Sequence, residues 1–534
     1  MRRESVKAIV AAMAMAVPIA PQAQARTVPV EERSIDELQA AMQRGAASSV
    51  DLTRAYLKRI AAMDRKGPTL RSIIALNPDA LTQARRLDAE RRDGRTRGPL
   101  HGIPVLIKDN IETADPVATT AGSLALRDNV TRRDAPLVAY LRRAGAVILG
   151  KTNLSEWANI RSDRSMSGWS AIGGLVRNPY ALDRTACGSS SGSGAAVAAS
   201  FAAAAVGTET DGSIVCPSST NGLVGFKPTL GLVSRTRVVP ISHSQDTPGP
   251  MARSVRDAAV LLSAMAGPDP SDAATAGTTV RDYAAGLSTA ALSGLRIGVV
   301  RPDGLPADLT ARFDAALDVI RAAGATLVDV TPPNAEGLGA AELLVLQTEL
   351  KADLDAYLST TPAIVTTRGL DQVIAFNRAH AAQEMPFFAQ ETFEAAAKTR
   401  GLDDPAYKAA RATSLRLAGK DGIDAMLKSA RADLLVEPTY AAAWLSDPVY
   451  GDQYGGPSAS ELPAVAGYPH LTVPMGLMRG LPVGLSFIGA RGTDAAVLNA
   501  GYAYEQRARA RVAPRYAPSA EVPAALDGTA PRAR

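Results

Sequence analysis

The stretch APLVAYLRRAGAVILGKTNL, residues 135–154, indicates the fold class, because it joins a helix, a turn and a buried strand. Its first half spaces leucine and valine at helical intervals, Gly145 marks the turn, and the run AVILG is continuously apolar. Upstream, GIPVLIKDNI at residues 102–111 is also apolar and ends in polar residues. Helices that alternate with such strands are typical of an α/β protein with a largely parallel sheet.

Helical spacing also appears near the N-terminus, over residues 34–45 and 48–67. We expect Ser34 to cap the first of these helices, and Ser49 or Asp51 to cap the second.

The rest of the chain continues the α/β pattern. The run GAAVAASFAAAAVG at 194–207 predicts one helix of small residues. Residues 295–331 predict a strand, a helix and a strand, residues 338–433 are mainly helical, and residues 461–489 hold two further strands. We find no internal repeat and no linker that divides the chain, so the sequence predicts one large domain over residues 26–510.

The positive charge lies at the two ends of the chain. The net charge is +5, of which +2 falls in residues 1–25 and +4 in residues 507–534, which leaves −1 on the body. A body without basic excess gives no reason to expect a nucleic-acid partner. The Pro-, Ala- and Arg-rich residues 511–534 predict a disordered tail.

The first 25 residues have the pattern of an export signal. A basic MRRESVK is followed by the apolar AIVAAMAMAVPIA, and AQA at Ala23–Ala25 fits cleavage before Arg26. The apolar run is too short to span a bilayer, although an uncleaved membrane anchor is the alternative. We therefore expect a periplasmic or secreted protein, with no stable membrane association after cleavage and with the choice between general and twin-arginine export left open.

The chain has two cysteines, Cys187 and Cys216, on either side of a serine-rich region. In an oxidising compartment they can form a disulfide, and two buried free thiols are the other interpretation.

The sequence gives no support for metal, nucleotide or cofactor chemistry. Its histidines have no metal-ligand spacing, and neither a phosphate-binding loop nor a dinucleotide fingerprint is present. We expect no cofactor and no metal.

One hydrolase motif centres on Ser190. GSSSG at residues 188–192 fits G-x-S-x-G, the nucleophile elbow of an α/β-hydrolase-type esterase. Such an elbow sits directly between a strand and a helix, whereas a long loop precedes Ser190 here. The available candidate partners downstream are His380 and His470. The interpretation that we prefer is that Ser190 orients the loop.

Three other motifs form a more specific pattern. HGIPVLIKDN contains Lys108 at a strand end, CGSSSGSGAAVAA is a serine cluster before a helix, and GTETDGSI contains Ser213 in a glycine turn. In order and spacing they resemble the amidase signature family, and the resemblance extends over residues 35–500, weakest at 300–440. It implies a single large α/β/α domain with a mixed, largely parallel central sheet covered by helices.

The resemblance also implies a catalytic triad without histidine. Its nucleophile is Ser213, and its bridging serine, 24 residues earlier, is Ser189, preceded by a cis peptide bond from Gly188. Lys108 would be the base; it must be neutral to accept a proton, and burial favours that form. An acyl-enzyme would form on Ser213. The oxyanion hole would consist of backbone N–H groups of Ser213 and the three residues before it, Thr210, Asp211 and Gly212.

The motif TETDGS resembles the peptide amidase branch of the family, which removes C-terminal amides of peptides. This implies a small-molecule or short-peptide amide as substrate. The alternative on the same triad is an aryl-acylamide, carbamate or ester hydrolase. Asp211 would contact the substrate or hold the turn, and residues 444–458 would line the pocket. Three further charged residues are interpreted as structural: Asp246, Arg253 and Asp257.

Overall fold

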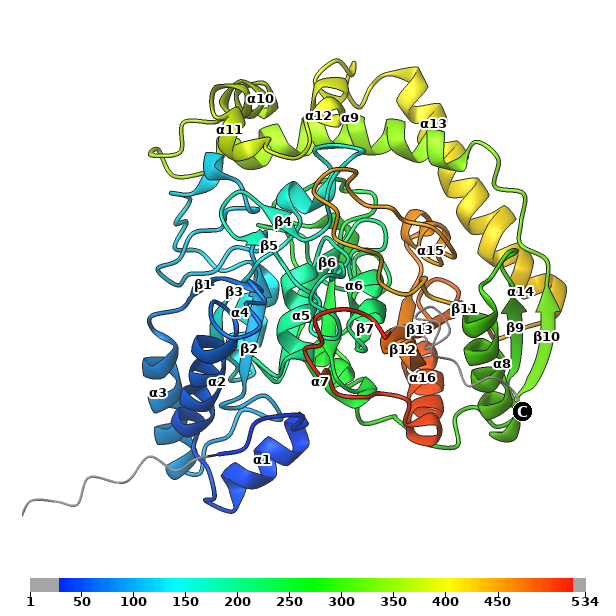
Figure 1. The fold of residues 1–534 in the computed structure, drawn as a ribbon, viewed down its shortest axis with the longest axis horizontal. Helices are drawn as coiled ribbons and strands as arrows, with labels where there is room; N and C mark the ends of the chain where they lie inside the picture. Colours follow the sequence, from blue (N-terminus) through cyan, green and yellow to red (C-terminus); the bar gives the residue numbers. More distant parts are fainter. Residues whose placement is uncertain (1–27, 522–534) are drawn as a thin grey trace, which may run out of the picture.

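A twisted sheet of 11 strands forms the core of the protein, which is described here by a computed structural model covering residues 28–521 (Figure 1). The predicted export signal at 1–25 and the last part of the predicted tail, 522–534, lie outside the described residues. In spatial order the strands are β1 (Ile73–Leu76), β3 (Val147–Thr152), β2 (Pro104–Lys108), β6 (Ala204–Glu209), β8 (Thr247–Ala252), β7 (Val224–Lys227), β12 (His470–Met478), β13 (Leu481–Ile488), β11 (Leu434–Pro438), β9 (Arg296–Val300) and β10 (Thr326–Val330).

The sheet is mixed. Strand β2 pairs in parallel with β3 and β6, and β9 pairs in parallel with β10 and β11. The strands between these two blocks pair antiparallel, as does β1 with β3. The predicted α/β class, with a mixed central sheet covered by helices, is confirmed.

Helices cover both faces of the sheet, and a helical cap, residues 338–430, arches over one edge (Figure 1). The covering helices are α1 (Ile35–Gln43), α2 (Ser49–Met63), α3 (Ala80–Arg92), α4 (Pro136–Arg143), α5 (Ser191–Ala198), α6 (Val215–Thr220), α7 (Val255–Met265), α8 (Ala307–Ala322), α15 (Glu461–Ala466) and α16 (Asp494–Ala508). The cap contains α9 (Leu338–Ser359), α10 (Leu370–Ala379), α11 (Ala381–Glu384), α12 (Glu391–Ala396), α13 (Pro405–Leu415) and α14 (Asp424–Ala430). Within residues 28–521, no helix has both the length and the apolar character that crossing a membrane requires.

The N-terminal helices begin with capping boxes. Ser34 accepts from the backbone N–H of Glu37 as predicted, whereas the cap of α2 is Ser48, not Ser49 or Asp51. The Asp51 carboxylate accepts from the backbone N–H of Ser48, and the Ser48 hydroxyl accepts from the backbone N–H of Asp51. These two hydrogen bonds satisfy two backbone donors that the helix itself leaves free.

The alanine-rich run divides into two elements instead of forming one helix. Helix α5 ends at Ala198, Ser200 adopts φ 56°, and Ala204 begins β6. The second half becomes a strand because it lies between β2 and β8 and hydrogen-bonds to both. Small side chains allow this central strand to be fully buried under close-packed helices.

Residues 511–521 are packed against the body, so the prediction of a disordered tail is wrong for them. The backbone N–H of Leu182 donates to Ala517 O at 2.8 Å, and that of Tyr516 donates to Pro179 O at 2.9 Å. Arg511 forms a 2.8 Å ion pair with Glu32. Residues 511–521 are therefore held by backbone hydrogen bonds and by this ion pair, neither of which can be inferred from their composition.

Candidate active site

The three predicted motifs meet at one edge of the sheet. Lys108 is the last residue of β2, and the turn that carries Ser213 follows the parallel strand β6. The carboxyl ends of adjacent parallel strands lie at the same edge, which is where open α/β sheets place their sites. The serine loop reaches this edge just before α5 begins, and it brings Ser189 to Lys108.

Lys108 is fully buried and hydrogen-bonded. Its Nζ lies 2.7 Å from Ser189 Oγ, 2.9 Å from Thr208 Oγ1 and 3.2 Å from Thr208 O. Burial lowers the pKa of Lys108 to about 7, although the negative charges of Asp246 and Glu209 oppose the shift. The lysine can therefore be neutral near physiological pH.

The neighbouring acid, Asp109, does not pair with Lys108. Its carboxylate lies 3.0 Å from the Nζ of Lys151, and both side chains are buried. This ion pair leaves Lys108 with hydroxyl and carbonyl partners.

The peptide bond between Gly188 and Ser189 is cis, as the resemblance implied. The loop is tight at this point, since a Cβ on Gly188 would lie 2.2 Å from Ser155 Oγ. The backbone N–H of Ser155 donates to Ser189 O at 3.0 Å, which fixes the bridging serine from its other side.

Glu209 holds the turn that carries Ser213. Its buried carboxylate accepts from the backbone N–H of Ile214 at 2.8 Å and of Val215 at 3.0 Å. Gly212 within the turn has φ +76°, which favours glycine. Ser213 is 7% exposed, and its carbonyl accepts from Ser190 N at 3.2 Å.

A second set of bonds fixes Thr210. Its Oγ1 donates to Asp246 Oδ1 at 2.5 Å, and its carbonyl accepts from Gln245 Nε2 at 3.1 Å. Asp246 also accepts from the backbone N–H of Ile241 at 2.8 Å and of Ser242 at 3.0 Å. The structural interpretation of Asp246 agrees with these contacts.

Arg253 and Asp257 also have structural contacts. Arg253 donates to the carbonyls of Val197 and Ala202, each at 3.0 Å, across the end of α5. Asp257 accepts from the backbone N–H of Ile35 at 3.0 Å and so joins α7 to α1.

The nucleophile elbow considered for Ser190 is not formed. Ser190 Oγ donates to Thr208 O at 3.1 Å and accepts from Thr208 N at 3.2 Å, so it fastens the loop to β6. Both candidate histidines have other partners: His470 Nε2 lies 2.7 Å from Ser486 Oγ, and His380 Nδ1 lies 2.9 Å from Phe376 O.

Cys187 and Cys216 form a disulfide. It joins the residue before Gly188 to helix α6, directly after the Ser213 turn. The question that the sequence left open is therefore answered, and the disulfide links the two serine-bearing segments.

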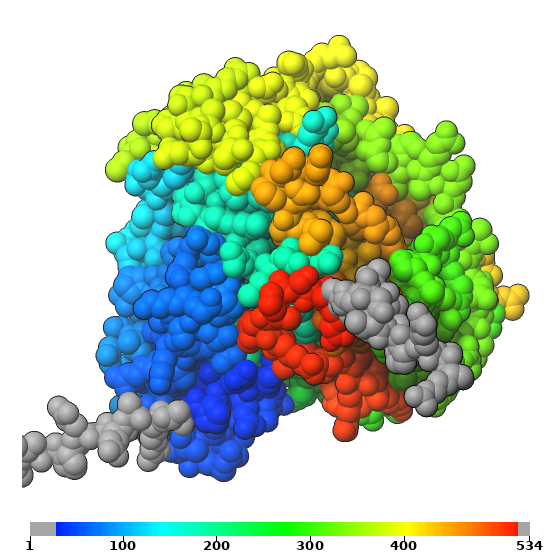
Figure 2. All heavy atoms as spheres, in the orientation of Figure 1, coloured from blue at the N-terminus to red at the C-terminus, as the bar shows by residue number. Residues whose placement is uncertain are grey.

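A cavity of about 320 Å³ opens onto Ser213. Figure 2 shows the orange segment around residue 450, part of the 444–458 loop, against the yellow helical cap. Residues of this loop line the cavity, as predicted. The lining includes Ile160, Gly188, Thr210, Asp211, Ser213, Ile241, Leu346, Tyr440, Trp444, Asp452 and Tyr454.

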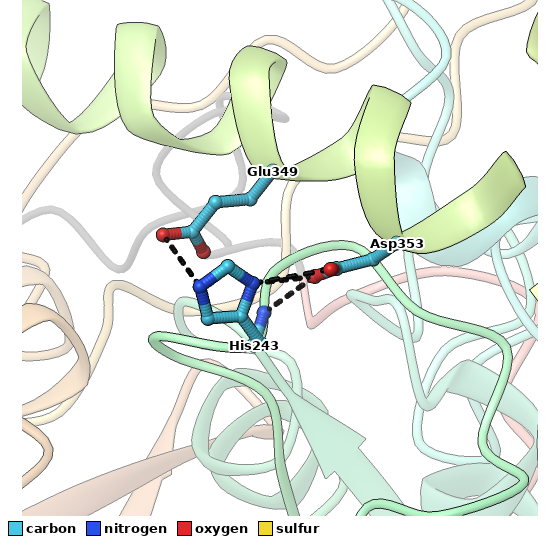
Figure 3. A group of neighbouring side chains, drawn as sticks. All are labelled: His243, Glu349 and Asp353. Carbon is cyan, nitrogen blue, oxygen red and sulfur yellow. Dashed lines mark hydrogen bonds and ion pairs between the residues drawn. The ribbon is translucent and has the colours of Figure 1, made fainter. Parts of the chain in front are cut away.

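One group among the described residues has potential metal-ligand atoms within 4.8 Å of one another: His243, Glu349 and Asp353 (Figure 3). His243 Nδ1 lies 2.9 Å from Asp353 and Nε2 lies 3.5 Å from Glu349, so the two ring nitrogens face different carboxylates. Glu349 already accepts from the hydroxyls of Ser244 and Tyr407. These three residues connect α9 to the 241–246 segment through hydrogen bonds.

The motifs identified the lysine and the serines, but not the residues that hold them. Thr208 and Glu209 lie within the quoted GTETDGSI, where strand alternation places their side chains on opposite faces. Gln245 and Tyr440 come from other segments, and no local signal in the sequence connects either residue to the turn.

Comparison with known proteins gives extensive matches. A family profile described as Amidase matches residues 51–498. The structure of peptide amidase PAM with the competitive inhibitor chymostatin is 53% identical, with a TM-score of 0.88 and coverage of 91% of this chain and 100% of that chain. Native peptide amidase from Stenotrophomonas maltophilia is 52% identical, with a TM-score of 0.86 and coverage of 91% and 99%. A probable amidase of Arabidopsis thaliana is 38% identical over 92% of this chain and 93% of its own length.

Proposed function

This chain belongs to the amidase signature family and is an amide-hydrolysing enzyme, and on that premise we propose that it is a peptide amidase with a Ser213–Ser189–Lys108 triad. The observation that carries the proposal is the 2.7 Å contact between a fully buried Lys108 and Ser189. A lysine whose pKa burial lowers to about 7 can serve as a base.

In the proposed reaction Ser213 Oγ attacks the carboxamide carbon. Its proton passes to Ser189 Oγ as Ser189 gives its own proton to Lys108 Nζ. The carbonyl oxygen becomes an oxyanion, stabilised by backbone N–H groups of the 210–213 turn, and one such donor typically contributes 100- to 1000-fold in rate. The relay then returns the proton to the leaving nitrogen, and ammonia departs.

The acyl-enzyme is hydrolysed by the same groups. Water attacks the Ser213 ester, its proton passes through Ser189 to Lys108, and the return of a proton to Ser213 releases the carboxylic acid. Each step uses groups of this chain and requires no cofactor.

The peptide amide substrate is favoured by two observations. The two peptide amidase structures are 52–53% identical to this chain over 91% of its length. The cavity beside Ser213 has room for a short peptide end, and its lining combines apolar, aromatic and hydroxyl side chains. We propose no nucleic-acid partner.

We further propose export to the periplasm or medium, with the mature protein starting at Arg26 and free of stable membrane association. Residues 26–510 would form the amidase domain, and residues 511–521 would complete it. The Cys187–Cys216 disulfide fits an oxidising compartment. Mass determination of the protein from a cell-envelope fraction tests this, and an intact Met1 on the bulk of the protein contradicts it.

Ammonia release from a C-terminally amidated dipeptide tests the activity. We expect release by the wild type, its loss in Ser213→Ala, and its retention in Ser190→Ala if that variant folds. Release that persists in Ser213→Ala contradicts the triad. Activity on an anilide, a carbamate or an ester, with none on the peptide amide, would favour the alternative substrate class on the same triad.

A further inference from the structure

The cavity beside Ser213 carries negative charge without a basic neighbour in its lining. Two carboxylates line it, Asp211 and Asp452, and among its described lining residues none is lysine or arginine. Both oxygens of Asp452 are engaged, one by Trp444 Nε1 at 2.9 Å and the other by Ser167 N at 3.1 Å. Asp211, in contrast, is exposed to the cavity two residues before the proposed nucleophile.

The charge of Asp211 affects the groups around it. It contributes to the raised pKa of Glu342, about 9, and to the raised pKa of Glu461, after burial in both cases. Burial raises the pKa of Asp211 itself, whereas a hydrogen bond from Ser460 and the attraction of Lys227 oppose this shift. The Lys227 ammonium is buried within the body, where it donates to Pro228 O at 3.2 Å. The cavity side of Asp211 is left without a compensating cation, so a positive group that enters there meets a favourable field.

An aromatic wall stands beside the same carboxylate. Tyr454 packs against Tyr440 and Trp444, with ring centroids 5.8 and 5.3 Å apart, and all three rings line the cavity. Tyr440 is close to the turn, because its hydroxyl would lie 2.3 Å from a Cβ on Gly212. Aromatic faces together with a carboxylate are a common environment for an ammonium group.

On the basis of the proposed function, we propose that Asp211 is a specificity residue that selects amides whose acyl part carries a protonated amine. The ammonium would pair with the Asp211 carboxylate and lie against the aromatic wall while the scissile carbonyl lies at the 210–213 turn. The amine is either the free α-amine of an amino-acid amide or a basic side chain on the residue whose amide is cleaved.

Two matched pairs of substrates separate these sources. Leucinamide against N-acetyl-leucinamide tests the α-amine, and N-acetyl-lysinamide against N-acetyl-norleucinamide tests the side chain. We expect the wild type to favour the cationic member of at least one pair in kcat/KM by about 10- to 100-fold, the range for a charge-assisted hydrogen bond. The preferred pair identifies the source.

Two variants test the assignment to Asp211. Asp211→Asn keeps the backbone donors and should reduce the preference to about 3-fold or less, since the amide retains size but no charge. Asp403→Asn removes the same charge from an exposed ion pair with Lys408 and should keep the preference. Hydrolysis of the neutral amides without any cationic preference, or an undiminished preference in Asp211→Asn, overturns the inference but leaves the amidase function intact. Failure on every amide overturns both.

Discussion

Lys108 Nζ lies 2.7 Å from Ser189 Oγ at the buried end of β2. The other partner of the lysine is Thr208, on the adjacent strand β6. Two hydrogen-bonded strands position Lys108 and Thr208, whereas the loop before α5 brings Ser189 to the lysine, so the contact depends on both the sheet and this loop.

Replacement of Lys108 by methionine should lower kcat by about 100- to 10,000-fold, the usual contribution of a positioned acid–base group. The apolar side chain suits the buried site, so the free energy of unfolding should not fall. Ammonia release and urea unfolding measure the two effects. A variant that keeps a tenth or more of the wild-type kcat would show that Lys108 is not the base.

The pH dependence should follow the same lysine. Only neutral Lys108 accepts a proton, and burial lowers its pKa to about 7, so kcat/KM should rise from pH 5.5 to 8 and then level off. Burial raises the pKa of Asp246 to about 6, so Asp246 also changes its charge within the pH range in which kcat/KM rises. In Asp246→Asn the rise in rate should remain but move to lower pH, because this variant removes a negative charge that raises the pKa of Lys108. A rate that is flat from pH 5.5 to 8 in the wild type contradicts this assignment.

Gly212→Ala should reduce activity strongly, because the new Cβ would lie 2.3 Å from Tyr440 Oη at a residue with φ +76°. Tyr440→Phe removes the closest atom and leaves Ser460 Oγ 3.0 Å and the ring carbon of residue 440 3.3 Å away. The double variant should therefore recover part of the lost kcat, with backbone strain of about 1 kcal/mol remaining. If the two losses simply add in a double-mutant cycle, this contact is not the cause.

Loss of the Cys187–Cys216 disulfide should destabilise the protein. The two cysteines are 29 residues apart, and a loop of this length contributes about 3–4 kcal/mol in the chain-entropy account. Urea unfolding with and without reductant measures the difference, and the double Cys→Ser variant, which should not respond to reductant, is the control. Wild-type unfolding that does not change with reductant would contradict the prediction.

Sequence patterns identified the residues of the proposed triad because they lie in three compact motifs. They could not locate Gln245 or Tyr440, which reach the turn only through the tertiary fold. Propensity also misassigned the alanine run, since pairing with β2 and β8 determines the conformation of Ala204–Glu209.

Strand β8 is a second element whose conformation could not be predicted from local propensity. Its sequence TPGPMA has prolines at 248 and 250, which argue against a strand in the middle of a sheet. The ladder with β6 includes both prolines, opposite Thr208 and Val206, whereas the ladder with β7 contains only the pairs at Met251 and Ala252. The prolines therefore lie where β8 has a paired strand on one side only, as on an edge strand.

The contact between Glu32 and Arg511 brings the two ends of the described chain together. The order of segments along the gene is therefore not a requirement of the architecture. A circular permutant, closed by a flexible linker and opened at an exposed turn such as that near Gly401, keeps residues 108–213 contiguous and can present its new ends on the helical cap for fusion to another protein.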